Sequence, residues 1–205
     1  YNSVFQGYFR AQNVKAVGYQ AFYNSVFTGV FNCPNLQTVD YQAFYYSQFN
    51  GTINLPVCEY VGDYAFRNSQ FTGDFNCPNL QTVRMGAFRN SVFTGTFNCP
   101  NLQIVGSDVF YYSQFNGVFN CPNLTSVGIY SFYYSQFNGV FNCPNLQTVG
   151  NNAFRNSNFT QITIGANATL GTGCIGAHSA EFINDYVANN KKAGTYVWNG
   201  QHWIY

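Results

Sequence analysis

The residues best suited to chemistry lie close together near the C-terminus. Cys174, His178 and Asp185 could in principle supply a nucleophile, a base and an orienting acid. Their local order fits no family of nucleophilic enzymes, and the alternative interpretation of His178 is a surface histidine beside the start of a helix. The sequence has only 2 histidines, His178 and His202, whereas a structural zinc site takes about four ligands. We expect neither a catalytic site nor a metal site.

Carboxylates are also too sparse to indicate an enzyme. A glycosidase needs two facing carboxylates, but Glu59 and Glu181 are the only glutamates and the aspartates are scattered. No phosphate-binding loop of the GxxxxGK[ST] type occurs in the sequence. We therefore expect a protein that is not an enzyme and that uses no cofactor.

The low charge content and the lack of long apolar runs argue against two further classes of protein. Charged residues make up 7% of the 205 residues and the net charge is +1. Nucleic-acid binding depends on clustered lysine and arginine, so it is not expected. No apolar run reaches the roughly 18 residues of a membrane-spanning helix, so no transmembrane segment is expected either.

A strict internal repeat dominates the sequence. A phenylalanine returns every 22 residues from Phe22 to Phe154, and all 6 prolines occupy one place in this frame. Two further phenylalanine columns, a valine column and a leucine column follow the same period. Residues that return to the same place in every unit must stack on themselves, which predicts a solenoid. The first unit fits this frame with its opening places missing, so we expect the chain to start inside a coil.

The segment Phe75-Asn76-Cys77 shows how one coil is built. Its alternation predicts a short strand with Phe75 and Cys77 pointing inward, and successive strands should pair in parallel about 4.8 Å apart. Leucine and alanine also occur in the cysteine column, so the thiols there should be buried and free rather than bridged. We expect the same of Cys58 in the leucine column, whereas Cys174, outside the repeats, should be the most accessible cysteine.

The repeated skeleton V-G-x-x-A-F-x-N-S-x-F…F-N-C-P-N-L-x-x-V resembles the BspA-like leucine-rich repeat family. The unit differs from the family pattern in being 22 residues long, in having phenylalanine for most leucines, and in having serine for the cysteine of AFxxC. The resemblance implies an α/β repeat solenoid with mostly short parallel β-strands, a leucine-rich-repeat superhelix of 22-residue coils. It also implies a secreted or surface-anchored, bacterial protein that acts in adhesion or partner binding, without catalysis.

Two places after each repeated Ala-Phe vary between otherwise similar coils. They alternate between tyrosine pairs and arginine-containing pairs, a composition that protein interfaces favour. The candidate binding residues are Tyr45, Tyr46, Arg67, Arg89, Tyr111, Tyr112, Tyr133, Tyr134 and Arg155. Exposed tyrosines of this kind could also bind a glycan. A neighbouring asparagine column, Asn32 to Asn142, is interpreted first as an amide ladder that stabilises the stack and second as a ligand contact.

The repeat decays after Phe159, and the tail should cap the open end of the solenoid. Ser179 can serve as the N-cap of a helix that Gly194 closes, and Asn199-Gly200 predicts a type I′ hairpin turn. We divide the chain into a solenoid over 1–164 and a helix-plus-hairpin C-terminal cap over 165–205.

These features together predict a non-catalytic binding protein, extracellular or at a cell surface, and monomeric. Its partner should be a host or neighbouring-cell surface or matrix protein. A glycan-binding repeat protein and a structural spacer for another module are the alternatives. A spacer would have no saturable ligand and would tolerate loss of the tyrosines.

Overall fold

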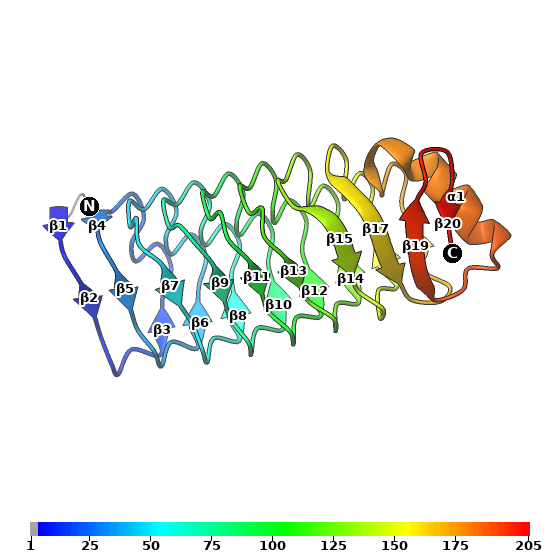
Figure 1. Ribbon diagram of the computed structural model, residues 1–205. Helices are drawn as coiled ribbons and strands as arrows, with labels where there is room; N and C mark the ends of the chain where they lie inside the picture. Colours follow the sequence, from blue (N-terminus) through cyan, green and yellow to red (C-terminus); the bar gives the residue numbers. More distant parts are fainter. Residues whose placement is uncertain (1–3) are drawn as a thin grey trace.

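Each repeat forms one coil, and the coils stack side by side along a single axis (Figure 1). The computed structural model describes residues 4–205, so the opening residues of the first coil lie outside the described residues. From β2 to β16, paired residues of successive coils are 22 positions apart, as in Phe75 with Phe97 and Val83 with Val105. The spacing falls to 20 or 21 only in the pairing of the last coil, as in Thr148 with Thr169. The predicted parallel solenoid of 22-residue coils is therefore confirmed.

One side of the solenoid is a parallel sheet made from the Phe-Asn pair of most coils, with Arg10 replacing the asparagine once and Ile53 replacing the phenylalanine once. The strands are β2 (Phe9–Arg10), β5 (Phe31–Asn32), β7 (Ile53–Asn54), β9 (Phe75–Asn76), β11 (Phe97–Asn98) and β13 (Phe119–Asn120). The phenylalanine of each pair points inward, and Phe75 is fully buried while Asn76 is exposed. In every one of these coils except that of β2, where Gln12 takes its place, the proline two places later has no N–H to donate, which ends the strand.

A second parallel sheet, which the sequence analysis did not assign, uses the valine column. Its strands are β3 (Ala16–Val17), β6 (Thr38–Val39), β8 (Tyr60–Val61), β10 (Thr82–Val83), β12 (Ile104–Val105), β14 (Ser126–Val127), β16 (Thr148–Val149) and β18 (Thr169–Leu170). Two-residue strands carry too little alternation to be recognised from sequence, although their buried valines are visible as a column. The two sheets meet at the Pro-Asn turns, along the lower edge of Figure 1.

The core consists of three rows of phenylalanine rings that run along the axis. Within a row the rings stack, and Phe44 and Phe66 have centroids 5.2 Å apart at 5°. Between rows the rings meet edge to face, and Phe75 contacts Phe88 at 4.7 Å and 74°. Both arrangements are favourable for aromatic quadrupoles. The rings therefore explain why phenylalanine replaces leucine in this chain.

The cysteine column lies inside this core. Cys33, Cys77, Cys99, Cys121 and Cys143 are all buried and all free, as predicted, and so is Cys58. Burial raises the pKa of the Cys99 and Cys121 thiols well above the usual value. These side chains act as small apolar core residues.

A different arrangement closes the C-terminal end. Its elements are β15 (Asn138–Asn142), β17 (Asn158–Ile164), a short 3₁₀ turn (Gly176–His178), α1 (Ser179–Ala188), β19 (Gly194–Trp198) and β20 (Trp203–Ile204). Strand β17 pairs in parallel with β15 and antiparallel with β19, so it joins the repeats to the hairpin. At the opposite end, β1 (Val4–Gln6) pairs with β4 (Val26–Thr28). Strand β18 extends the valine-column sheet beyond residue 164. The division of the chain into a solenoid and a cap at that residue stays a prediction.

The helix and hairpin exist, but three local predictions about them are wrong. Ser179 does not cap α1 with its side chain; it lies inside the helix and its hydroxyl accepts from Ile175 N at 3.3 Å. Gly194 begins β19 rather than ending the helix, because Asn190 and Lys191 already adopt the left-handed conformation that terminates it. The hairpin turn is centred one residue later than Asn199-Gly200.

The shift of this turn has a local cause. The Asn199 side chain accepts hydrogen bonds from Gln201 N at 2.9 Å and His202 N at 2.8 Å. This bonding fixes Asn199 as the first residue of the turn, with φ outside the left-handed region that a type I′ turn requires. Trp198 and Trp203 are consequently direct cross-strand partners.

Candidate binding surface

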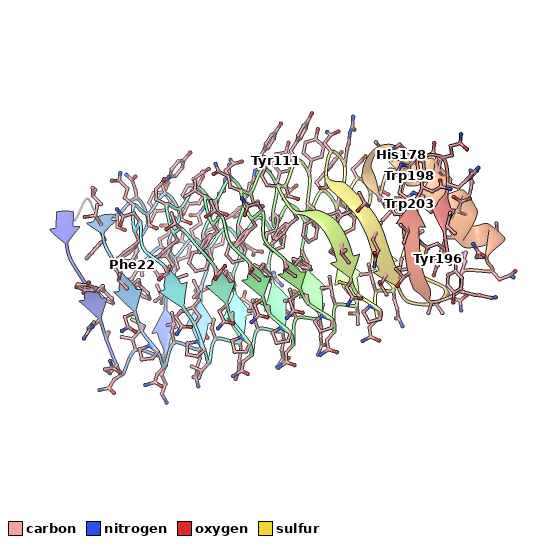
Figure 2. The ribbon with its side chains drawn as sticks, viewed as in Figure 1. Phe22, Tyr111, His178, Tyr196, Trp198 and Trp203 are labelled. Atoms are coloured by element: carbon pink, nitrogen blue, oxygen red, sulfur yellow. The ribbon has the colours of Figure 1, made fainter. Side chains whose placement is uncertain are left out.

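The Ala-Phe turn of each coil forms the edge opposite the Pro-Asn turns, and Figure 2 shows Tyr111 projecting from it. We call this the tyrosine edge. It comprises two adjacent columns, one at residues 23, 45, 67, 89, 111, 133 and 155 and the other one place later in each coil. Backbone hydrogen bonds tie each turn to the next coil, such as Tyr112 N to Tyr133 O at 2.9 Å. The edge is therefore a rigid continuation of the solenoid.

The first column of the tyrosine edge forms a stacked series of rings and guanidinium groups. Tyr45 stacks on Tyr23 with centroids 5.2 Å apart, and the Arg67 guanidinium lies 5.4 Å from the Tyr45 ring. Further along, Arg89 lies 4.1 Å from the ring of Tyr111, which stacks on Tyr133 at 4.8 Å. These contacts hold the side chains of the first column in place.

The second column has an unusual backbone. Every member adopts a positive φ between 50° and 62°. The members are Asn24, Tyr46, Asn68, Asn90, Tyr112, Tyr134 and Asn156. Asparagine tolerates this left-handed conformation, whereas a bulky aromatic residue there is a genuine outlier. Three tyrosines thus occupy positions for which the backbone favours asparagine.

These three tyrosines are also the most open on the edge. Tyr46, Tyr112 and Tyr134 are 50%, 49% and 42% exposed. Tyr112 and Tyr134 stack on each other with centroids 4.9 Å apart at 4°. Partial desolvation and the neighbouring tyrosines raise the pKa of Tyr112. Its hydroxyl, like that of an ordinary tyrosine, is a hydrogen-bond donor at neutral pH. Unfavourable backbone together with exposed rings is typical of a functional surface rather than of a packing role.

The nine residues predicted from sequence all lie on this edge, in two clusters. The first cluster contains Tyr45, Tyr46 and Arg67, and the second contains Arg89, Tyr111, Tyr112, Tyr133, Tyr134 and Arg155. The sequence analysis did not include Tyr23, Tyr64 and Tyr130, which contact these residues. The 22-residue period alone would have found Tyr23, since it occupies the same column as Tyr45.

One acidic residue is positioned beside the second cluster. Asp108 Oδ2 lies 3.4 Å from Arg89 Nη1. Burial raises the pKa of Asp108, and the positive charges of Arg89 and Arg67 oppose this shift without cancelling it. Asp108 also has a positive φ of 57°, in a further left-handed column two residues before the Ala-Phe phenylalanine.

The sequence matches the family described as BspA type leucine rich repeat region, with six copies over residues 3–116 and 59–180. The chain belongs to the BspA-type leucine-rich repeat family. Membership in this family points to a surface repeat protein that binds other proteins. No curated protein and no solved structure matches the chain.

Within this BspA-type chain, the cysteine, histidine and aspartate near the C-terminus have separate surroundings. His178 stacks on Trp198 with centroids 3.9 Å apart (Figure 2). Asp185 accepts from Trp203 N at 2.7 Å and pairs with His202 at 3.4 Å. The expectation that Cys174 is accessible is wrong: it is fully buried.

The cap buries Cys174 because α1 folds back over the last coil. Its Sγ lies 3.6 Å from the Ser179 hydroxyl, and burial raises the pKa of the thiol. A buried thiol with a raised pKa is a poor nucleophile. Among residues 4–205, no three cysteine, histidine or acidic side chains are grouped to hold a metal ion. Over the same residues, no helix has the length and apolar character to cross a membrane.

The asparagine column on the Phe-Asn sheet forms the predicted amide ladder over three coils. Asn98 Nδ2 donates to Asn76 Oδ1 at 2.9 Å, and Asn120 Nδ2 donates to Asn98 Oδ1 at 2.7 Å. The ladder is confirmed for these three residues, whereas the side chains of Asn32, Asn54 and Asn142 make no such bond in the described part of the chain.

Proposed function

We propose that this protein is a non-catalytic binding protein, secreted or held at a cell surface, whose tyrosine edge recognises a protein partner. The partner would be a surface or matrix protein of a host or a neighbouring cell. The second cluster carries the proposal: Tyr112 and Tyr134 expose stacked rings from backbone positions that favour asparagine.

The composition of the second cluster supports a protein partner. Tyrosine and arginine are enriched among the residues that contribute most to interface binding energy. Four tyrosines and two arginines lie side by side here, and the stacking and cation–π contacts among them restrict their side chains. Because these side chains are already ordered, they lose less conformational entropy when a partner binds.

The decisive experiment measures binding of the purified protein to immobilised matrix and cell-surface proteins by surface plasmon resonance. The test variant is Tyr112→Asn with Tyr134→Asn, which restores the residue that the backbone favours and removes both rings. The control is Asn101→Ala on the opposite edge. We expect saturable binding that the test variant weakens at least tenfold, about 1.4 kcal/mol, and that the control leaves unchanged.

Two outcomes would contradict the proposal. Equal binding by the test variant would remove the second cluster from the recognition surface. Absence of saturable binding by a folded, monodisperse protein would favour the spacer function instead.

A further inference from the structure

A hollow beside Tyr46 differs in kind from the second cluster. It has a volume of about 430 Å³ and lies next to the tyrosine edge. Its lining includes Asn24, Tyr46, Gln48, Asn50, Asn68 and Gln70. These residues come from three successive coils, so the hollow follows the solenoid axis.

In the part of the chain that the structure describes, no ring stacks parallel to that of Tyr46. Its neighbours in the second column are Asn24 and Asn68, whereas Tyr112 has Tyr134 as a neighbour at 4.9 Å. Its one ring contact in the described part of the chain is the edge-to-face contact with Tyr45 at 4.8 Å and 71°. The shorter asparagine side chains leave room beside the ring. An apolar ring surface is thus available to a ligand at Tyr46.

The polar groups around this ring are unused by the fold. The side-chain amides of Asn24, Gln48, Asn68 and Gln70 have no hydrogen-bond partner within residues 4–205. Only Asn50 is engaged, since its Oδ1 accepts from Gly29 N at 3.0 Å. Each free amide offers both a donor and an acceptor.

No charged side chain lines the hollow among the described residues. A charged ligand would therefore lose hydration without finding an opposite charge. A neutral ligand with hydroxyl groups matches the amides, because a hydroxyl also donates and accepts. A ligand that presents a C–H face between such hydroxyls would match the tyrosine ring as well. These two properties together describe a pyranose sugar.

The hollow on the opposite edge is a useful contrast. It has a volume of about 490 Å³ and is lined by Glu59, Asn79, Gln81, Asn101, Gln103 and Asn123. It contains no aromatic residue, and the Asn123 amide is bound to the Pro100 carbonyl. It has neither the ring nor the neutral lining of the Tyr46 hollow.

We propose that the Tyr46 hollow is a binding site for a neutral oligosaccharide, with Tyr46 stacking on one sugar and Gln48 and Gln70 bonding to its hydroxyls. The left-handed backbone supports this assignment. Tyr46 has φ 54°, whereas Asn24 and Asn68 hold the same place with the better-suited residue. The ring at position 46 is unfavourable for the fold, so folding alone gives no reason for it. This site is separate from the second cluster and does not depend on the protein-binding proposal.

The test is isothermal titration calorimetry of the whole protein with short neutral oligosaccharides of glucose, mannose, galactose and N-acetylglucosamine. Tyr46→Asn removes the ring and restores the residue of the column. Gln48→Ala with Gln70→Ala removes the amides. Tyr112→Asn is the matched control, because it makes the same change in another coil.

We expect saturable binding to at least one oligosaccharide. Tyr46→Asn and the double glutamine variant should each weaken it at least tenfold, and Tyr112→Asn should leave it unchanged. Thermal unfolding should show that Tyr46→Asn is at least as stable as the parent protein, so that a loss of binding is not a loss of folding.

Three results would overturn the proposal. They are absence of saturable binding to every oligosaccharide, unchanged binding by Tyr46→Asn, and an equal loss in Tyr46→Asn and Tyr112→Asn. If Tyr46→Asn lowered binding of a protein partner but not of a sugar, Tyr46 would belong to the protein-binding surface. Failure here leaves the effect of Tyr112 and Tyr134 on protein binding intact, so the two proposals are separable.

Discussion

The two edges of the solenoid are built on the same coils but use their side chains differently. On the edge formed by the Pro-Asn turns, side-chain amides bind the preceding coil. Asn35 Nδ2 donates to the Gln12 carbonyl at 2.8 Å, and Asn123 Nδ2 donates to the Pro100 carbonyl at 3.0 Å. On the tyrosine edge, by contrast, rings and guanidinium groups stack on one another. Successive coils are joined there by hydrogen bonds between backbone N–H and carbonyl groups.

The sequence differs between the two edges in the same way, since one edge is nearly uniform and the other is variable. An asparagine follows the turn proline in every such coil except the one with Val57, and the amides of Asn35, Asn123 and Asn145 bond to the preceding coil. The side chain at the second column of the tyrosine edge is not needed by the coil, and asparagine and tyrosine alternate there. Variation at the tyrosine edge therefore changes what the surface presents without changing the stack.

The largest effect should come from the core that supports both edges. Phe88 stacks between Phe66 and Phe110 at 5.2 and 5.6 Å and is fully buried. Phe88→Ala should lower the free energy of unfolding by about 3–5 kcal/mol, measured by urea denaturation. A loss no larger than that of an edge substitution would contradict the assignment of stability to the ring rows.

A smaller effect should separate bonded from unbonded amides within one row of the Pro-Asn edge. Asn123→Ala removes the hydrogen bond to Pro100, and we expect a loss of about 1 kcal/mol in unfolding free energy. Asn101→Ala is the matched control, because the Asn101 side chain has no hydrogen-bond partner in the described part of the chain. Equal losses in the two variants would show that the bond to the preceding coil does not stabilise the stack.

The smallest effect concerns Asp108 beside the second cluster. Because burial raises its pKa in the folded protein, the folded state favours the protonated carboxyl. The associated stability is present below the unfolded pKa and is lost as the pH rises through the folded pKa. Asp108→Asn removes the carboxyl, so the melting temperature of the variant relative to the parent should increase as the pH is raised across this range.

The left-handed backbone at position 108 also contributes to the difference in melting temperature between Asp108→Asn and the parent protein, but this contribution does not change with pH. Asparagine suits φ 57° better than most residues, which favours the variant equally at every pH. Only the change of this melting-temperature difference with pH measures the effect of ionising the Asp108 carboxyl. A relative melting temperature that falls as the pH rises would mean that the ion pair with Arg89 outweighs burial.

Much of the fold could be predicted because its residues repeat. The phenylalanine columns, the Phe-Asn strands and their parallel register follow from the spacing of Phe75, Phe97 and Phe119. The positions of the nine candidate residues on one edge follow from the same period. Here each coil contacts mainly its neighbours, so local sequence determines most of the contacts.

The features that were missed depend on contacts that do not repeat. Cys174 is buried because α1 folds back across the last coil, and no spacing in the sequence encodes that packing. The turn of the hairpin is displaced by the side chain of Asn199. The left-handed columns do repeat, but they mix asparagine and aspartate, which tolerate this backbone, with residues such as Gln42 and Tyr64, which do not ordinarily mark it.

The constant coil length has a consequence for how such a surface can be remodelled. Since the coils from β2 to β16 pair with a register of 22 residues, removal of one whole coil from this part would join two matching ends and preserve its columns. Removal of the two coils that carry Arg67 and Arg89 would place Tyr45 directly before Tyr111 and Tyr46 directly before Tyr112. Two separate aromatic clusters would become one continuous strip through a deletion alone. In this architecture, a change in the number of coils alters the exposed surface while the packing of the core columns stays the same.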